Sequence, residues 1–219
     1  MTILKDKKVQ DLKNLKYLLP NTKKLLLFLI DNCKFLNKYV LVGGSALTLY
    51  LHHRKSEDLD FFTYENLFDK KEILDYIKDF NQSEILNQTD DQIDLLLDGI
   101  KITFFNSKWS FLKPLSPQRF NIAPLECIAA MKVNLLFLRA KYRDYYDLYF
   151  LVKNGMGLKE LFEVSKKIVP GITFKLLATA LIYIDDIEED NINHLEPIEH
   201  ITKEEIRDYF QKKLKEKVK

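Results

Sequence analysis

The chain has 219 residues, which is enough for one large domain or two small ones. Apolar residues make up 47% of the sequence and aromatic residues 12%, a composition that supports a packed core and excludes a disordered chain. The formal net charge is only +2, and the longest apolar run, Leu25 to Ile30, is too short to span a bilayer.

Two features of the sequence favour a cytoplasmic protein. The first twenty residues contain several lysines and no signal-peptide core, so we expect neither export nor a membrane partner. Cys33 and Cys127 lie in apolar helical contexts, where reduced packing residues are expected. The four histidines show no zinc-ligand spacing.

Charge is distributed unevenly along the chain. Residues 1–39 carry nine Lys and three acids, a net of +6, and residues 56–98 carry thirteen acids and three Lys, a net of −10. Residues 101–153 carry nine basic and three acidic residues, again a net of +6. This layout suits an acidic metal site flanked by surfaces that bind polyanions, although solvated helix faces would also account for most of the lysines.

Residues 1–36 are expected to be helical and to form a layer against a sheet. Asn21 or Thr22 is a suitable N-cap for the second helix. Four apolar residues fall near helical spacing and are expected to be buried together: Leu25, Phe28, Leu29 and Leu36.

The next segment predicts a phosphate-binding turn. Tyr39–Val42 is expected to be a strand, Gly43-Gly44-Ser45 a tight turn, and residues 46–53 a short helix. Such a turn presents free backbone N–H groups at the positive end of a helix, where a phosphate can bind.

A second strand over residues 59–62 places two carboxylates together. Residues i and i+2 of a strand share a face, so Asp58 and Asp60 point the same way while Leu59 and Phe61 point into the core. Two adjacent carboxylates repel each other unless a divalent cation binds between them. The segment therefore predicts metal-assisted chemistry on a nucleoside triphosphate. Gly-Gly turns and acidic pairs are common separately, so the prediction rests on their ordered combination.

A hairpin is expected to extend the sheet. It follows an amphipathic helix over residues 67–80 and a polar loop over residues 81–91, with a short strand around Ile85. Asp98-Gly99 predicts a two-residue turn within residues 93–105, and this turn sets the register. Three pairs then lie on the core face: Leu97 with Ile100, Leu95 with Ile102, and Ile93 with Phe104. On the other face, Asp94 lies opposite Thr103.

The rest of the chain is expected to be helical after a linker over residues 106–123. A long helical region runs from Pro124 to about Lys153, and Asn154-Gly155 ends it. Further helices are expected over residues 158–168, 172–184 and 203–217, with a loop over residues 185–190. Thr202 and Glu205 form a capping box for the last helix.

The long helical region carries a second set of charged residues: Lys132, Arg139, Arg143, Asp144 and Asp147. On an unbroken helix, the three basic residues fall within about 20° of one another and Asp147 about 60° away, a stripe able to bind phosphates. Asp144 points away from this stripe unless the helix breaks near Ala140. Alternatively, these residues form helical (i, i+4) ion pairs such as Arg143–Asp147, without a functional role.

Two motifs resemble those of a known family. Gly44-Ser45, twelve further residues and then Asp58-Leu59-Asp60 resemble the signature of the DNA polymerase β-like nucleotidyltransferase superfamily. The wider pattern, His53-Arg54-x-Ser56-x-Asp58 after the Gly-Gly-Ser turn and a later R-x-K-x-R-D-x-x-D run, is similar to the AbiEii-like branch. That branch comprises the toxins of type IV toxin–antitoxin systems and their relatives. The resemblance spans roughly residues 39–153.

The resemblance implies a toxin or phage-defence enzyme that transfers NMP from an NTP to an RNA acceptor with Mg²⁺ or Mn²⁺. The best-known acceptors of the family are tRNA 3′ ends, and a cognate antitoxin is an expected partner. Asp58 and Asp60 would hold the metal. Lys132 would neutralise developing phosphate charge, while Asp144 or Asp147 would orient Lys132 or the acceptor hydroxyl. Nucleotide binding would fall to Gly43, Gly44, Ser45, Arg54, Ser56, Arg139 and Arg143.

One position departs from the family pattern. Relatives usually carry a third carboxylate where this chain has Thr103, and a hydroxyl does not replace that charge. Asp94 lies opposite, with Cβ atoms about 5 Å apart, and could supply a third metal ligand from the neighbouring strand. Otherwise the chain is a weakened or inactive nucleotide- or RNA-binding module on the same scaffold. A third alternative is a protein–protein partner, such as a regulatory component of a toxin–antitoxin pair.

The expected fold class is α+β, with a small mixed β-sheet core, flanking helices and an α-helical C-terminal part. We place the N-terminal helices and the nucleotidyltransferase core in residues 1–112 and a helical C-terminal domain in residues 113–219. The sequence specifies no oligomeric state.

Overall fold

A computed structural model describes residues 12–65, 68–114, 119–187 and 191–216 of the chain. The described residues divide into two compact units. The sheet unit contains residues 12–50 and 55–124, and the helical unit contains residues 51–54 and 125–216. No helix within the described ranges has the length and apolarity needed to cross a membrane.

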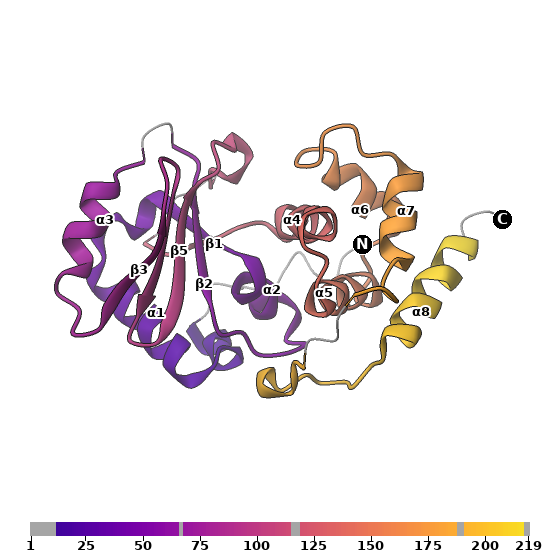
Figure 1. Cartoon of the computed structure of the whole chain (residues 1–219), viewed down its shortest axis with the longest axis horizontal. Helices are drawn as coiled ribbons and strands as arrows, with labels where there is room; N and C mark the ends of the chain where they lie inside the picture. The colour runs from indigo at the N-terminus through magenta and orange to yellow at the C-terminus, as the bar shows by residue number, and fades with distance from the viewer. Residues whose placement is uncertain (1–11, 66–67, 115–118, 188–190, 217–219) are drawn as a thin grey trace. The chain divides into compact units, whose positions relative to one another are not determined.

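The sheet unit is built on six strands in the order β3-β4-β5-β2-β1-β6 (Figure 1). The strands are β1 (Tyr39–Val42), β2 (Leu59–Thr63), β3 (Ser83–Gln88), β4 (Gln92–Leu97), β5 (Ile100–Asn106) and β6 (Asn121–Ile122). β1 and β6 pair in parallel, as do β2 and β5, whereas the remaining neighbours are antiparallel. This mixed sheet with helices around it confirms the predicted α+β class.

Helices cover one face of this sheet (Figure 1). They are α1 (Pro20–Asn32), the 3₁₀ helix η2 (Lys34–Lys38) and α3 (Lys70–Ile77). The ring of Phe35 in η2 lies 5.9 Å from that of Phe104 in β5 and 5.5 Å from that of Tyr76 in α3. Phe61 and Phe104 on this face are only 1% and 2% exposed, so the core of the unit lies here.

The hairpin follows the predicted register pair by pair. Leu97 is opposite Ile100, Ile93 is opposite Phe104, and Asp94 is opposite Thr103. Asp98 and Gly99 have φ values of 49° and 79°, the positive values that a type I′ turn requires at both positions.

The first helices differ from the prediction in their caps. The 3₁₀ helix η1 (Leu12–Tyr17) precedes α1, and residues 1–11 lie outside the described part. Leu19 is the N-cap of α1, because Pro20 fits the first helical position, so the prediction of Asn21 or Thr22 is wrong. Thr22 instead donates a hydrogen bond of 2.7 Å to the Glu57 carbonyl.

The predicted buried face of α1 is wrong at one position. Leu25, Leu29 and Leu36 are buried, but Phe28 is 48% exposed. Phe28 packs by its edge against Phe80, with ring centroids 5.5 Å apart, at the margin of the core.

Two further helix boundaries differ from the prediction. α2 (Gly43–Leu51) begins at Gly43 itself, so no separate turn precedes the helix. It ends before His52, whose φ of 57° is incompatible with a right-handed helix. α3 begins at Lys70 because the Asp69 carboxylate caps it by accepting from Glu72 N at 2.9 Å. Residue 67, the predicted start, lies outside the described part.

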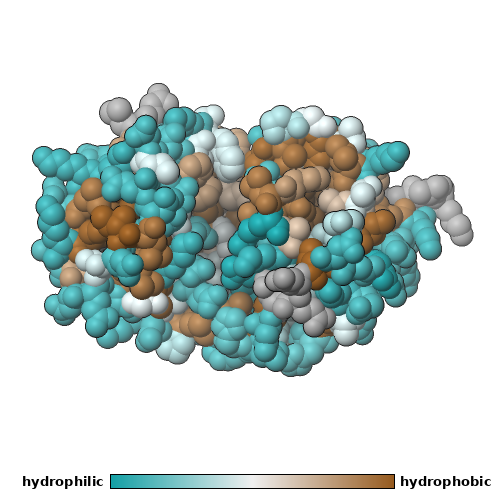
Figure 2. Space-filling view, in the orientation of Figure 1, coloured by the Kyte–Doolittle hydropathy of each residue, from teal (hydrophilic) through white to brown (hydrophobic). Residues whose placement is uncertain are grey.

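The short strand expected around Ile85 is confirmed as β3, whereas the strand β6 lies in a segment expected to be a linker. The same linker also contains the 3₁₀ helix η3 (Ser110–Leu112). β3 is exposed along its whole length and β6 has two residues, so neither shows alternating polarity. Ile85 and Leu86 of β3 are 47% and 46% exposed, and Figure 2 shows a hydrophobic patch at left, over α3 and β3.

The helical unit contains five α-helices among its described residues. They are α4 (Leu125–Leu138), α5 (Tyr142–Lys153), α6 (Leu158–Ser165), α7 (Phe174–Ile182) and α8 (Lys203–Glu216). The long helical region expected up to Lys153 is interrupted between α4 and α5 at Ala140, with φ 44°, where the sequence required a break if Asp144 was to join the basic residues. The stop at Asn154 and the capping box of α8 are also confirmed, since Thr202 N donates to Glu205 at 2.8 Å. The end of the loop expected over residues 185–190 lies outside the described part.

Candidate functional site

The sheet unit carries a polar row on the face opposite its core. Asp60 of β2 is level with Thr103 of β5, and Thr103 is level with Asp94 of β4. Side chains at matched positions of adjacent strands share a face, so these three residues form a row across three strands, here called the acidic row.

Gly43 brings the start of α2 against this row. A Cβ atom placed on Gly43 would lie 2.3 Å from Oδ2 of Asp60, and the φ of Gly43 is 67°. Only glycine therefore fits without a shift of the carboxylate. The first N–H groups of a helix have no partner within it, so the positive end of α2 lies directly beside Asp60.

Ser45 fixes the neighbouring carboxylate residue through its backbone. Its hydroxyl donates a hydrogen bond to the carbonyl of Asp58, and its side chain is buried. The predicted phosphate-binding residues Gly43, Gly44 and Ser45 thus form the first turn of α2 and are joined to the Asp58–Asp60 segment.

Asp94 is held by neutral hydrogen-bond donors. Its carboxylate accepts from Thr103 Oγ1 at 2.7 Å, from Gln92 Nε2 at 2.8 Å and from Asn87 Nδ2 at 3.2 Å. Burial alone would raise the pKa of Asp94, but these hydrogen bonds outweigh it and lower the pKa below its ordinary value. Asp94 therefore stays ionised, and the proton of the Thr103 hydroxyl points toward it.

The chemistry of Asp58 and Asp60 fits a hard divalent cation. Both side chains are partly exposed, and carboxylate oxygens are the ligands that Mg²⁺ and Mn²⁺ prefer. Within the described ranges, no three His, Cys, Asp or Glu side chains gather closely enough to hold one metal ion. Asp94 stands one strand beyond Thr103, so its role as a direct third ligand stays a prediction.

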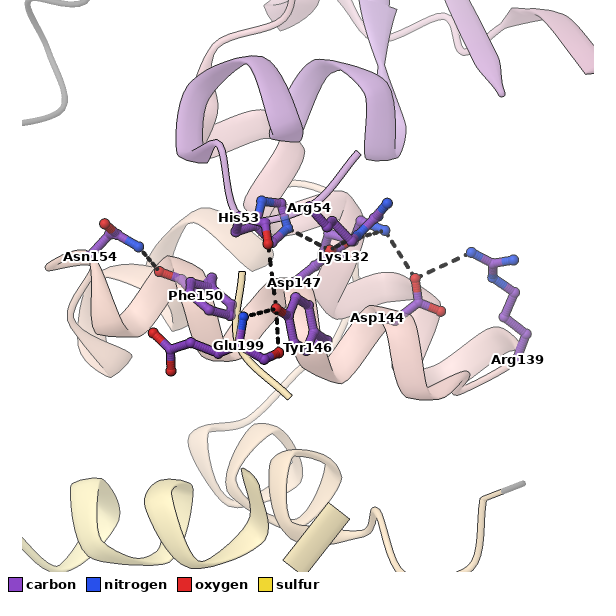
Figure 3. Close-up of polar contacts among 10 residues, drawn as sticks. All are labelled: His53, Arg54, Lys132, Arg139, Asp144, Tyr146, Asp147, Phe150, Asn154 and Glu199. Carbon is purple, nitrogen blue, oxygen red and sulfur yellow. Dashed lines mark hydrogen bonds and ion pairs between the residues drawn. The ribbon is translucent and has the colours of Figure 1, made fainter. Parts of the chain in front are cut away.

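The helical unit contains a set of charged side chains withdrawn from water (Figure 3). This buried ionic cluster consists of His53, Arg54, Lys132, Asp144 and Asp147, each at most 4% exposed. Residues 51–54 contribute the first two and α4 and α5 the rest. Each buried charge needs a partner, because an unpaired one is strongly destabilising.

Asp147 is the centre of the cluster. Its carboxylate accepts two hydrogen bonds from Arg54, at 2.8 and 2.9 Å, and lies 2.7 Å from both Lys132 Nζ and His53 Nε2. Burial alone would raise the pKa of Asp147, but the charges of Arg54 and Lys132 hold it well below its usual range.

His53 stays neutral in this environment. Burial lowers its pKa, and this effect exceeds the opposing hydrogen bond and charge of Asp147. Because Asp147 can only accept, Nε2 carries the proton, and the buried Nδ1 has no hydrogen-bond partner among the residues that the structure describes.

Lys132 bridges the two acidic residues of α5. Its ammonium lies 3.0 Å from Asp144 Oδ1 and 2.7 Å from Asp147 Oδ2. Asp144 also accepts from Arg139 at 3.2 Å and from the backbone of Lys141 at 3.4 Å, near the start of α5. The helix break at Ala140 is therefore what brings Asp144 to Lys132, which meets the condition stated from the sequence.

The remaining predicted site residues lie in separate environments. Ser56 is buried, and its carbonyl accepts from Leu19 N at 3.0 Å. Arg143 is partly exposed on α5, whereas the side chain of Arg139 is 38% exposed beyond the end of α4.

Sequence reasoning missed the part that His53, Gln92 and Asn87 play. His53 and Asp147 are 94 residues apart, so no local spacing connects them. Gln92 lies two residues before Asp94 on the same strand face, a relation that the predicted hairpin already contained.

The mixed sheet, with a Gly-Ser helix start beside an Asp-x-Asp strand, defines the nucleotidyltransferase-like class. The family model for the nucleotidyl transferase AbiEii toxin of the type IV TA system matches residues 25–103 and 92–213. The chain belongs to this family, which confirms the resemblance.

Similar proteins come from several bacteria. The uncharacterized protein aq_aa25 of Aquifex aeolicus (strain VF5) is 36% identical over 187 residues, covering 82% of this chain and 88% of that protein. JHP933 from Helicobacter pylori is similar in structure, with a TM-score of 0.53 and 24% identity over 90% of this chain and 91% of that one. For MenT4, the nucleotidyltransferase toxin Rv2826c from Mycobacterium tuberculosis H37Rv, the TM-score is 0.56 and the identity 16%, over 94% and 82% of the two chains. At these identities the two structural likenesses establish the fold alone.

Proposed function

We propose that this chain transfers NMP from a nucleoside triphosphate to an RNA acceptor, with tRNA 3′ ends as the first candidates. Family membership supports the general reaction class. The acidic row and the start of α2 support the position of the triphosphate.

The contact between Gly43 and Asp60 carries the proposal. It sets the N–H groups at the start of α2 beside one carboxylate of the Asp58–Asp60 pair. A metal-bound triphosphate requires both kinds of partner, since N–H groups bind phosphate oxygens and carboxylates bind the cation.

In the proposed transfer, the acceptor hydroxyl oxygen forms a bond to the α-phosphorus. The bond from that phosphorus to the β-phosphate oxygen breaks, and pyrophosphate and one proton leave. Asp58 and Asp60 would hold Mg²⁺ or Mn²⁺, and the first turn of α2 would orient the phosphates. When bound, the cation would neutralise negative charge that develops during transfer.

The proposed partners follow from the family and from charge. Arg139 and Arg143 would bind RNA phosphates, and Lys132, Asp144 and Asp147 are candidates for a part in the transfer. As a type IV toxin, the chain would be neutralised in the cytoplasm by a cognate antitoxin.

The test is to incubate the purified chain with total tRNA and each labelled NTP, with and without Mg²⁺. We expect Mg²⁺-dependent label on RNA, and none with an Asp58→Asn, Asp60→Asn double variant whose circular dichroism matches wild type. Labelling that persists in the double variant would contradict the proposed metal site.

Thr103 supports a second candidate function, a nucleotide- or RNA-binding module without catalysis. A neutral hydroxyl stands in the middle of the acidic row, where its proton is directed to Asp94. This candidate predicts that the chain binds NTP or RNA but places no label on RNA.

A further inference from the structure

An aromatic group lies beside the acidic row on the same face of the sheet. Phe62 is two residues after Asp60 on β2, and Phe105 is two residues after Thr103 on β5. Their rings are 4.9 Å apart, and Trp109 follows with its ring 6.1 Å from Phe62. We call Phe62, Phe105 and Trp109 the aromatic shelf.

The shelf differs from the aromatic core on the other face. Phe61 and Phe104, the adjacent residues in the same strands, stack on each other and are 1% and 2% exposed. The three shelf residues remain partly exposed. Packing in the core accounts for Phe61 and Phe104. It does not account for the apolar ring surface that the shelf residues leave exposed on the opposite face of the sheet.

Hydrogen bonds fix the loop that presents Trp109. Trp109 N donates to Ser107 Oγ at 3.2 Å, and the same hydroxyl donates to the Thr63 carbonyl at 3.1 Å. Asn106 Oδ1 accepts from Lys108 N at 3.1 Å, which closes the preceding turn. Phe111 stacks on Trp109, with ring centroids 5.6 Å apart and an interplanar angle of 17°. Trp109 is therefore held in a defined orientation before any ligand binds.

We propose that the aromatic shelf stacks against the nucleobase of the donor nucleoside triphosphate. The inference rests on the proposed function, which sets the phosphates at Asp60 and the start of α2. Two residues along a strand correspond to about 6.6 Å, a separation that the ribose between phosphate and base can span. Every nucleobase has a flat π-face, so stacking on these rings gives affinity with little sequence preference.

Trp109 is the only tryptophan in the chain, so its fluorescence reports on the shelf directly. The wild-type chain is titrated with non-hydrolysable analogues of ATP, GTP, CTP and UTP, and separately with tripolyphosphate. We expect the analogues to quench the fluorescence of Trp109 until binding saturates. Tripolyphosphate should compete with the analogues for binding but should not itself quench this fluorescence. Equal emission changes with tripolyphosphate and with the analogues would overturn the proposal.

Calorimetry then compares Phe62→Leu with Phe28→Leu, which changes a partly exposed aromatic residue of α1 in the same unit. We expect Phe62→Leu to raise the Kd for the analogues about 5- to 150-fold, with the Kd for tripolyphosphate unchanged. Phe28→Leu should alter neither value. An unchanged Kd for the analogues in Phe62→Leu would overturn the assignment to the donor base. So would a variant that binds RNA more weakly but binds the analogues as wild type does.

The labelling assay separates this inference from the proposed function. Transfer to RNA with a wild-type KM for NTP in Phe62→Leu would reject the shelf and retain the transferase. Binding of analogues that depends on Phe62, without transfer to any RNA, would retain the shelf and reject the transferase.

Discussion

Gly43 has no side chain, and this allows the start of α2 to lie against Asp60 of the acidic row. We predict that Gly43→Ala abolishes metal-dependent NTP binding, because the added Cβ would lie 2.3 Å from Asp60 Oδ2 and displace the carboxylate. The positive φ of 67° adds about 1–2 kcal/mol of backbone strain. Calorimetry with an NTP analogue and Mg²⁺, together with urea denaturation, measures both effects.

Gly171→Ala is the matched control for Gly43→Ala. Gly171 has a similar φ of 73°, but an added Cβ would meet no atom of the described residues within 4 Å. It should lose a similar amount of stability and keep NTP binding. Equal binding by both variants would show that the start of α2 does not position Asp60.

Lys132 neutralises two carboxylates that have no access to bulk water. We predict that Lys132→Met lowers the free energy of unfolding by about 3–5 kcal/mol, because Asp144 and Asp147 would lose a buried partner. Arg139→Met is the control, since its side chain is 38% exposed and the loss should stay below about 1 kcal/mol. Wild-type stability with abolished transfer would instead give Lys132 a chemical role.

His53 makes the stability of the helical unit sensitive to pH. Burial lowers its pKa below the ordinary 6.5, so near pH 6 the unfolded chain binds a proton that the folded chain excludes. The contribution of the neutral ring is therefore complete above about pH 6.5 and declines as the pH falls, by up to about 1.4 kcal/mol per unit.

We predict that His53→Gln, which keeps an N–H donor for Asp147, loses less stability than wild type between pH 7 and pH 5. Urea denaturation across this range measures the difference. His200→Gln, at an exposed position, should retain the wild-type profile. Parallel profiles for wild type and His53→Gln would contradict a neutral, buried His53.

Among the elements, the hairpin was predictable because its turn and its alternation agree. Asp98-Gly99 fixes the loop, and the buried face selects one register, which the structure confirms. β3 was predicted only as a short strand within a loop, and β6 was not predicted, because no alternation marks an exposed edge strand or a two-residue strand. The start of α2 was placed too late, because a helix that begins at glycine has no polar N-cap signal.

The hairpin also decides how Asp94 acts on the acidic row. Its carboxylate orients the Thr103 hydroxyl, so we predict that Asp94→Asn lowers transfer at least tenfold while Asp60→Asn abolishes it. Combining Asp94→Asn with Thr103→Asp should restore part of the activity by moving the charge beside Asp60. The labelling assay with tRNA measures all three variants. Wild-type activity in Asp94→Asn would show that Asp94 only stabilises the hairpin.

At the scale of the whole molecule, contacts distant in sequence were the least predictable. The Asp58–Asp60 pair was accessible because its members are two residues apart on one strand. Asp144 was a candidate only on the condition of a helix break near Ala140, and the structure contains that break. The partners of Asp147 were not accessible, since Arg54 is 93 residues away and Asp147 also fits an exposed helical ion pair with Arg143.

The uneven charge of the whole chain leads to the last prediction. With a net charge of +2, binding of RNA must depend on local basic residues rather than on the overall field. We predict that Arg139→Ala and Arg143→Ala each weaken tRNA binding and flatten the plot of log K against log salt by about 0.7, the value for one single-strand phosphate contact. Lys159→Ala removes the same charge from the exposed surface of α6 and should leave the slope unchanged.

Filter binding at 50–300 mM salt, a range of about sixfold, resolves such a change in slope. Each lost contact alters the ratio between the affinities at the lowest and the highest salt concentration about threefold. Equal slopes in all four proteins would mean that neither arginine contacts a phosphate, and the RNA surface would then have to lie elsewhere on the chain.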